Sequence, residues 1–405
     1  MNTAMNNDVY FKKIIEFHVW KQRLEFKVSQ DLFSSFDIDQ GTKFLLRSIV
    51  EANYQKPETI LDLGCGYGPI GLTLKSMFKD CTVHMVDIDA LAVEYSRQNA
   101  KLNGLSGVEV YASLGYDDVK RTDFNLIVSN IPGKTGEPVI KHFLTEAAHF
   151  LVPNGMVAIV VVTPLESFVE NVLSNTPGIE ILLKRIRPGH TVFHYRLNSA
   201  FMAPRPDKSA LARGIYDRSD FKFQINNLEI PIRVAANLPE FDTLSYGSEL
   251  ISNGLFKISK TRIQRAVVFN PNQGHLGVII WKLFHPEKII LVDRNLLALR
   301  YAKLNLILNK CSDENISVFH QINLDLDSIS EVDLFAIRLR EENREANLLM
   351  IKQASEKLAE SGLIIAAGSS TGISRLCDDI EPLRLFRIKA RERWRGNSLL
   401  ILQRS

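Results

Sequence analysis

Apolar runs of strand length alternate with longer mixed segments along the first half of the chain. The apolar runs are Thr59–Leu63, Val83–Val86, Phe124–Ser129 and Met156–Val162. The segments with helical character are Ile70–Phe78, Ala90–Asn103 and Val139–Leu151. The unbroken apolar stretch Val157–Val162 is typical of a strand that is buried on both faces. This order of strands and helices predicts an α/β fold with a parallel, doubly wound sheet.

The second half of the chain repeats this pattern weakly, because several residues recur 206 positions later. The recurring pairs are Gly41 and Gly247, Gly68 and Gly274, Asp87 and Asp293, Tyr95 and Tyr301, Asn99 and Asn305, and Asn103 and Asn309. A repeat this long indicates two domains and not a solenoid, whose units span about 20–50 residues. The segment that begins Ala203-Pro204-Arg205-Pro206 predicts a linker. We expect two tandem Rossmann-like domains, 1–202 and 221–405, joined by a linker at 203–220.

Composition limits the cellular setting more than it limits the function. The chain has 405 residues and a net charge of +3, which permits a nucleic-acid partner without requiring one. Its four cysteines form no Cys-x-x-Cys pair, so we expect neither a zinc site nor a disulfide framework. No apolar run reaches the ~18 residues of a membrane span, and the N-terminus lacks the apolar core of a signal peptide. These features predict a cytoplasmic protein without a metal site.

The most specific motif is a glycine-rich loop, Gly64-Cys65-Gly66-Tyr67-Gly68, between a predicted strand and a predicted helix. Glycines let a ligand approach the backbone closely, and the following helix N-terminus offers free N–H groups. Asp87 ends the next predicted strand, at the spacing of an acid that accepts hydrogen bonds from ribose hydroxyls. The pair predicts a nucleoside site, whereas the alternative is a glycine-rich turn without a ligand.

The glycines alone leave a dinucleotide site open, because Gly66–Gly71 also fits Gly-x-Gly-x-x-Gly. The acidic Asp62, two residues before Gly64, favours a different nucleoside, since an acid beside a pyrophosphate is unfavourable.

A second motif, Asn130-Ile131-Pro132, ends the predicted strand at Phe124–Ser129. An asparagine oxygen and a backbone carbonyl can accept the two N–H bonds of an exocyclic amine and so orient its nitrogen. The motif resembles the Asn-Pro-Pro-Phe/Tyr sequence of amino-group methyltransferases, with Gly133 in place of the aromatic residue that stacks on a target base. Phe33 or Phe36 is then the candidate stacking platform. The alternative is a turn that merely ends a strand.

Together these motifs resemble class I S-adenosylmethionine-dependent methyltransferases, in which Asp62 begins the Asp/Glu-x-Gly-x-Gly-x-Gly motif. Residues 26–197 resemble the small-domain type, above all the tandem-domain enzymes that methylate guanine N2 of ribosomal RNA. The resemblance implies S-adenosylmethionine as cofactor and an RNA partner, and we expect a monomer. The implied cofactor-binding residues are Thr42, Asp62, Gly64, Cys65, Gly66, Gly68, Asp87, Ile88 and Asn130. The implied catalytic residues are Asn130, Ile131 and Pro132, and the implied substrate-binding residues are Phe33 and Lys134.

The second copy lacks most of these residues. Val268, Asn270 and Asn272 stand where the first copy has Asp62, Gly64 and Gly66, and no Asn-x-Pro follows the matching strand. Side chains at the former glycines should block a cofactor, so we expect a retained fold with a lost site, and Asp293 as a relic or a surface acid. In the tandem enzymes the degenerate copy comes first, so the order here is reversed.

The second copy ends in a basic segment, residues 381–405, with seven Lys and Arg against two Glu and with Trp394 among them. This composition suits RNA, and an exposed edge strand explains it equally well.

These observations predict an N-methyltransferase for an exocyclic amine of structured RNA. The alternatives are a protein side-chain amide or small amine as acceptor, and a non-catalytic RNA-binding module.

Overall fold

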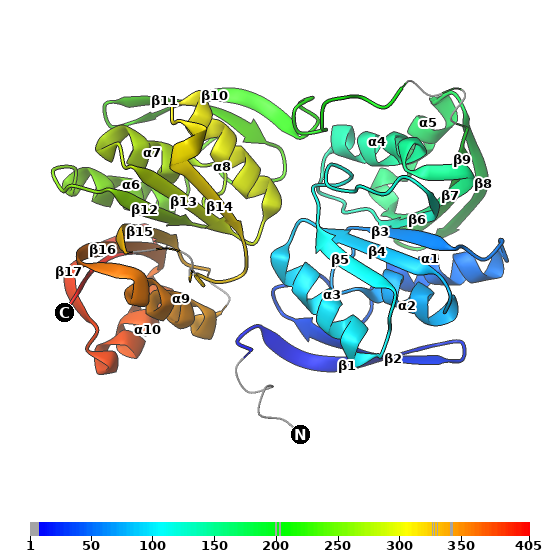
Figure 1. Cartoon of the computed structure of the whole chain (residues 1–405), viewed down its shortest axis with the longest axis horizontal. Coiled ribbons are helices and arrows are strands. Elements are labelled where there is room, and N and C mark those ends of the chain that lie inside the picture. Colours follow the sequence, from blue (N-terminus) through cyan, green and yellow to red (C-terminus); the bar gives the residue numbers. More distant parts are fainter. Residues whose placement is uncertain are drawn as a thin grey trace. The chain divides into compact units, whose positions relative to one another are not determined.

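The computed structural model describes residues 8–198, 201, 204–325, 327, 329, 331–340 and 343–405. Figure 1 shows that the chain forms two α/β units. The N-terminal unit is Phe11–Tyr216, and the C-terminal unit is Asp217–Ser405 together with the described residues 8–10. Each unit contains one seven-stranded sheet with helices on both faces. The predicted fold class, two tandem Rossmann-like domains, is confirmed.

The N-terminal unit begins with a β-hairpin and continues as alternating strands and helices. Its elements are β1 (Phe11–Val19), β2 (Gln22–Ser29), α1 (Gln40–Glu51), β3 (Thr59–Leu63), α2 (Pro69–Met77), β4 (Thr82–Asp87), α3 (Ala90–Leu102), β5 (Val108–Ala112), β6 (Phe124–Asn130), α4 (Glu137–Glu146), β7 (Leu151–Val162), α5 (Glu166–Asn175), β8 (Ile179–Arg187) and β9 (His190–Leu197). The sheet order is β5-β4-β3-β6-β7-β9-β8, and β9 runs antiparallel between β7 and β8. The strand order reverses beside β3, where open α/β sheets bind ligands at the carboxyl ends of their strands.

Side chains of β3 point alternately to the two faces of this sheet. Leu61 and Leu63 belong to a core cluster with α4 and α5, while Asp62 points to the opposite face and bonds α2. The expected helix at Val139–Leu151 is shorter than predicted. Helix α4 ends at Glu146, a 3-10 turn follows, and Leu151 already pairs with Phe124 as the first residue of β7.

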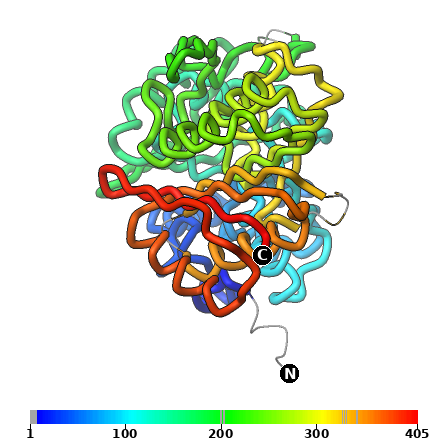
Figure 2. Tube along the Cα trace, turned by 90° about the vertical axis from the view of Figure 1, so that its left-hand side faces the viewer, coloured from blue at the N-terminus to red at the C-terminus, as the bar shows by residue number. Residues whose placement is uncertain are grey.

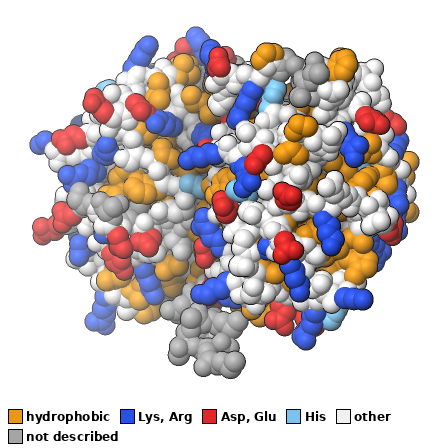
Figure 3. Space-filling model, turned by 45° about the vertical axis from the view of Figure 1, so that its right-hand side comes forward, with side chains coloured by type: hydrophobic (Ala, Val, Ile, Leu, Met, Phe, Trp, Pro, Cys, Tyr) orange, Lys and Arg blue, Asp and Glu red, His pale blue; other side chains and the backbone are white. Residues whose placement is uncertain are grey.

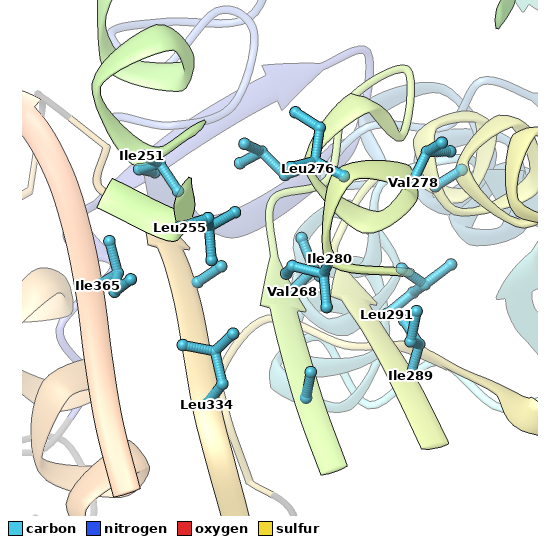
Figure 4. Packing of buried hydrophobic residues seen from close by; sticks show 14 of the residues in the cluster. Ile251, Leu255, Val268, Leu276, Val278, Ile280, Ile289, Leu291, Leu334 and Ile365 are labelled. Carbon is cyan, nitrogen blue, oxygen red and sulfur yellow. The ribbon is translucent and has the colours of Figure 1, made fainter. Parts of the chain in front are cut away.

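The C-terminal unit repeats the same order of elements. They are β10 (Asp217–Ile225), β11 (Leu228–Ala235), α6 (Tyr246–Lys257), β12 (Arg265–Phe269), α7 (His275–Phe284), β13 (Lys288–Asp293), α8 (Leu296–Leu308), β14 (Ile316–His320), β15 (Val332–Arg338), α9 (Arg344–Lys357), β16 (Leu358–Ser369), α10 (Ser370–Ile380), β17 (Phe386–Trp394) and β18 (Asn397–Arg404). The sheet order is β14-β13-β12-β15-β16-β18-β17. Figure 4 shows apolar side chains of α6 and α7 packed against β12, β13, β15 and β16 on one face.

The asparagines that recur between the halves hold each hairpin to its sheet. Asn99 of α3 exchanges hydrogen bonds with the backbone of Lys27, with Oδ1 accepting at 2.7 Å and Nδ2 donating at 3.0 Å. Asn305 of α8 bonds the backbone of Arg233 in the same way, at 2.8 Å in both directions. Each asparagine also donates to the loop before the following helix, Asn99 to the Tyr67 carbonyl at 2.8 Å and Asn305 to the Gln273 carbonyl at 2.6 Å, so the recurring spacing reflects a scaffold that both copies share.

The boundary between the units differs from the predicted linker at 203–220. Strand β10 already begins at Asp217, and Ala210 and Tyr216 are buried in the N-terminal unit. The Ala210 N–H donates to Asp117 Oδ1 at 2.7 Å, so this part of the chain packs as structure and not as a free spacer. The first described residues also differ from prediction, since Tyr10 donates to Asn323 of the C-terminal unit at 2.8 Å. Within the described residues, every helix is too short or too polar to cross a bilayer.

Candidate active site

The glycine-rich loop lies at the carboxyl end of β3 and leads into α2. Gly64, Gly66 and Gly68 have φ angles of 77°, 57° and 98°, which favour glycine over residues with a Cβ. A Cβ built on Gly64 or Gly66 has no atom within 4 Å, so both glycines border open space. At Gly68 a Cβ would lie 2.9 Å from the Leu72 side chain. The first two glycines therefore provide room for a ligand, and the third provides close packing.

Asp62 lies beneath the loop and not on its open side. Its side chain is fully buried, its Oδ2 accepts the Gly71 N–H at 2.8 Å, and its Oδ1 has no hydrogen-bond partner among the described residues. Burial, together with the charge of Asp87, raises the pKa of Asp62 to about 7. Asp62 therefore anchors the start of α2 and places a titratable charge below the loop.

Asp87 ends β4 and is partly exposed beside the loop, next to Ile88. Its Oδ2 accepts the Gly66 N–H and its Oδ1 accepts the Asp89 N–H, both at 2.9 Å. Burial and the neighbouring Asp89 charge raise the pKa of Asp87 to about 6. The carboxylate is thus held in one orientation at the edge of the open space.

Two residues within the loop face the interior. Cys65 is buried, with its sulfur 3.6 Å from Ser96 Oγ, and burial raises the pKa of its thiol, which argues against a nucleophile. Tyr67 is also buried, and its hydroxyl donates to the Ser34 carbonyl at 3.2 Å. This hydrogen bond ties the loop to the segment that carries Phe33.

Asn130 ends β6 and is oriented by helix α1. Its Nδ2 donates to Asp39 Oδ2 at 3.0 Å and to Thr42 Oγ1 at 3.2 Å. Asp39 is itself fixed as the N-cap of α1, since its Oδ2 also accepts the Thr42 N–H. No donor among the described residues bonds Asn130 Oδ1 or the Ile131 carbonyl. The end of β6 therefore presents two unused acceptors.

The remaining predicted residues differ in exposure. Ile131 is buried, whereas Pro132, Gly133 and Lys134 are exposed. A Cβ on Gly133 would meet only the Val162 side chain, at 3.4 Å, so the position is sterically open. Phe33 is 74% exposed, which is unusual for a large aromatic side chain.

Phe36 is equally exposed but is covered by charge. Lys12 Nζ lies 3.3 Å from the centre of its ring, and Lys13 donates to its carbonyl at 2.8 Å. Lys12 therefore occupies one face of the Phe36 ring, whereas no cation among the described residues lies over the Phe33 ring.

Two features of the site were missed by the sequence analysis. Asp39 was not among the predicted site residues, although its contact with Thr42 follows the usual pattern of an acidic N-cap. The turn after β5 was also missed: the Ser113 N–H donates to the Asp87 carbonyl at 3.0 Å, which brings this turn beside the end of β4. No local motif marks that turn, and only the strand order reveals it.

The C-terminal unit keeps the loop backbone but fills its open side. Asn270, Asn272 and Gly274 have φ angles of 56°, 50° and 94°, close to those of their counterparts. Asn270 Oδ1 accepts a hydrogen bond from Arg340 at 2.8 Å, and the same guanidinium lies 3.4 Å from Asp293 Oδ1. Asp293 is buried, so the expectation of a surface acid is wrong: an internal ion pair holds it.

The counterpart of Asn130 is Arg338, the last residue of β15. Its guanidinium lies 3.1 Å from Glu240 Oε1, and Glu240 is almost fully buried. Burial alone raises the pKa of Glu240, but the Arg338 charge and nearby hydrogen bonds outweigh it and hold the pKa below its usual value. A buried ion pair therefore replaces the amide of the first copy.

On the face shown in Figure 3, Lys and Arg side chains are interspersed with Asp and Glu. The geometry of single residues therefore says more about a ligand than the overall field does.

Comparison with known proteins agrees with this geometry. The methyltransferase small domain family matches residues 23–179. An uncharacterized protein of Bacillus subtilis, YbxB, is 36% identical over 154 residues, which cover 37% of this chain and 74% of that protein. Ribosomal RNA small subunit methyltransferase C of Hahella chejuensis is 35% identical over 133 residues, covering 32% of this chain but only 37% of that enzyme.

One solved structure is similar over nearly the whole length. It is the Thermus thermophilus 16S rRNA N2 G1207 methyltransferase in complex with AdoMet and guanosine. The TM-score is 0.68 at 13% identity, with 97% of this chain and 98% of that chain covered, which shows a common two-domain fold. The family model and the relatives at 36% and 35% identity confirm the family expected from the motifs. On its motifs and on these relatives, this chain belongs to the methyltransferase small domain family.

Proposed function

We propose that this chain is an S-adenosylmethionine-dependent N-methyltransferase that acts on an exocyclic amine of ribosomal or other structured RNA through its N-terminal unit. The observation that carries the proposal is the pair of unused acceptors at the end of β6, Asn130 Oδ1 and the Ile131 carbonyl, on the same sheet edge as the glycine-rich loop. RNA is chosen as acceptor because rRNA methyltransferases are among the relatives of this chain.

The residues around the loop fit the cofactor. The open space at Gly64 and Gly66 allows close approach to the backbone, and Asp87 can accept hydrogen bonds from ribose hydroxyls. When bound, S-adenosylmethionine supplies an electrophilic methyl group on a positively charged sulfur. Asp62, Cys65, Gly68 and Thr42 support this surface from below, so we assign them positioning roles.

The chemistry assigned to the chain is orientation of the amine. Asn130 Oδ1 and the Ile131 carbonyl accept one N–H each, which directs the nitrogen lone pair, and positioning of this kind supplies most of the rate. Asp39 and Thr42 fix the Asn130 amide so that its oxygen points to the acceptor. Pro132 shapes the turn after the motif, and Phe33 and Lys134 are assigned to the substrate base and phosphate.

A second acceptor class is favoured by one observation. Gly133 leaves open space where a base-stacking aromatic residue stands in related motifs, which suits a protein side-chain amide or a small amine. A third possibility, a non-catalytic RNA-binding module, requires that the N-terminal unit not bind the cofactor.

The test is transfer of tritiated methyl from S-adenosylmethionine into ribosomal RNA and subunits that lack native modifications, with wild type and Asn130→Ala. Asn171→Ala, an exposed asparagine on α5, is the matched control. Label in RNA that is lost only in Asn130→Ala supports the proposal. Cofactor binding without label in RNA moves the acceptor to protein or a small molecule, and absence of cofactor binding contradicts the enzyme assignment.

A further inference from the structure

The C-terminal unit contains an open pocket of about 910 Å³. It lies at the carboxyl ends of β15 and β16, between the N-terminus of α6 and the tip of the β10–β11 hairpin. Residues from all these elements line it, among them Arg338, Leu339, Gly368, Gly247, Asn226 and Asn397. The volume lies in the range of small-ligand sites, about 300–1,000 Å³.

This pocket occupies the acceptor side of the lost methyltransferase site. Arg338 is the counterpart of Asn130, and α6 is the counterpart of α1. In the N-terminal unit a Cβ on Gly41 would lie 2.7 Å from the ring of His190. In the C-terminal unit the equivalent Cβ, on Gly247, would find its nearest atom, Asn397 Oδ1, at 3.7 Å. Arg340 fills the cofactor side, whereas the acceptor side has more room at Gly247 than the N-terminal unit has at Gly41.

One exposed aromatic ring lines the pocket, and a second lies beside that ring. Tyr246 lines it and is 41% exposed, and Trp394 is 37% exposed with its ring centre 5.2 Å from that of Tyr246. Arg395 contacts both rings, and its guanidinium donates to the Tyr246 hydroxyl at 3.1 Å. Figure 2 shows the β17–β18 hairpin, in red, whose turn carries Arg395 and projects from the neighbouring trace. Exposed rings beside a guanidinium are the means by which proteins stack unpaired bases.

The pocket is lined by side chains of both charges and by neutral amide groups. Arg338 faces it together with the acids Asp242 and Glu249, and Asn253 and Asn397 add amide groups. A phosphate would be repelled by the two carboxylates. A flat, neutral ring could instead donate its N–H groups to the acids and accept hydrogen bonds at its carbonyl groups from the Arg and Asn side chains. The chemistry therefore favours a nucleobase over an anion.

We propose that this pocket receives one unstacked nucleobase of a single-stranded RNA segment, which Tyr246 and Trp394 hold by stacking. The C-terminal unit is then a second contact for the RNA, separate from the methyl-transfer site. This inference rests on the proposal that the substrate is RNA.

The experiment is fluorescence anisotropy of a labelled, unstructured RNA octamer at fixed salt, with thermal melts to verify that each variant folds. Trp394→Ala removes the stacking ring, and Gly247→Leu extends a side chain from a pocket-lining position where a Cβ would have no atom closer than 3.7 Å. Each should weaken binding about fivefold or more, the loss expected for one stacked base. Arg393→Ala, the matched control, removes an exposed charge from the opposite face of β17 and should change binding less than about twofold.

Crosslinking of 4-thiouridine RNA should attach label to Tyr246 or Trp394. Equal losses of RNA affinity in all three variants would overturn the proposed base-binding pocket. Unchanged affinity in Trp394→Ala and Gly247→Leu would overturn it as well. Competition by free AMP or GMP as strong as by the octamer would reassign it to a free nucleotide. Methyl transfer at saturating RNA, measured on the same variants, separates the two proposals. Activity that persists while RNA binding is weakened supports both proposals. Absence of methyl transfer in all proteins, together with the expected pattern of RNA binding, overturns the proposed function alone.

Discussion

The loop after β3 and the loop after β12 have the same backbone conformation. They differ in their surroundings, because the first borders open space and the second is covered by side chains. The φ angles at Gly64 and Gly66 are matched by Asn270 and Asn272, because asparagine tolerates the left-handed region better than most residues. The N–H groups of Gly64 and Asn270 even donate to equivalent carbonyls, those of Val86 and Val292. The second loop therefore keeps the backbone of the first, while side chains and an ion pair fill the space that is open beside Gly64 and Gly66.

The largest effect should come from giving the first loop the side chains of the second. Gly64→Asn with Gly66→Asn keeps a tolerated backbone, but both side chains enter the open space. We expect cofactor affinity, measured by calorimetry, to fall at least about a hundredfold, or roughly 2.7 kcal/mol. Gly104→Asn is the matched control, because Gly104 also has a left-handed φ, of 61°, and free space around its Cβ. Similar affinity losses in both proteins would break the comparison.

Removal of the two equivalent acids should have opposite consequences. Asp87→Ala should weaken cofactor binding about tenfold to a hundredfold, since hydrogen bonds to a charged group contribute roughly 1.5–3 kcal/mol. Asp293→Ala should leave cofactor binding unchanged. Instead it should lower the free energy of unfolding, because the partly buried Arg340 guanidinium loses its countercharge. Cofactor titrations and denaturant melts of both variants test this, and a weaker cofactor affinity in Asp293→Ala would count against a filled second site.

The pH dependence of the first site follows from two acids whose pKa values are raised. The pKa values of Asp62 and Asp87 are raised to about 7 and about 6, so these groups take up protons as the pH falls from 8 to 5. A protonated Asp87 loses acceptor capacity and a protonated Asp62 loses its charge, so cofactor affinity should decline over that range.

The free energy of unfolding should change in the opposite direction and rise as the pH falls over this range. A carboxyl whose pKa is raised in the folded state destabilises the fold above that pKa, and this penalty disappears as the pH falls toward the unfolded value. Asp62→Asn should therefore raise the free energy of unfolding at pH 8 by roughly 2 kcal/mol, from about 1.4 kcal/mol per pKa unit discounted for relaxation, with little effect at pH 4. A pH series of denaturant melts measures it, and a gain that does not depend on pH would refute the assigned titration.

The smallest effect concerns the acceptor. Gly133→Tyr places a ring in open space beside the end of β6, and base stacking contributes about 1–3 kcal/mol. We expect a rise of about fivefold or less in kcat/KM for RNA, because the proposal already assigns the Phe33 ring to the substrate base. Lower activity toward RNA together with folded protein would indicate that the open position serves a bulkier acceptor.

Some residues of the candidate site could be predicted from the sequence and others could not. The loop, Asp87 and Asn130 were predictable because local spacing places them at strand ends, and the substitutions at Asn270 and Asn272 predicted the lost site. The contact between Asn130 and Asp39 joins residues far apart in sequence, and so does the entry of Arg340 into the second site. The packing of residues 204–216 could not be predicted for a different reason. Proline and polar residues in this segment are typical of a free linker, but in the structure Ala210 and Tyr216 are buried.

The central claim is that the chain has one working cofactor site and that it lies in the N-terminal unit. Its most direct test is the stoichiometry of S-adenosylmethionine binding by isothermal titration calorimetry, in wild type and in Gly64→Asn with Gly66→Asn. The account predicts one site per chain in wild type and none in the variant. Two sites, or one site that survives the substitutions, would contradict it.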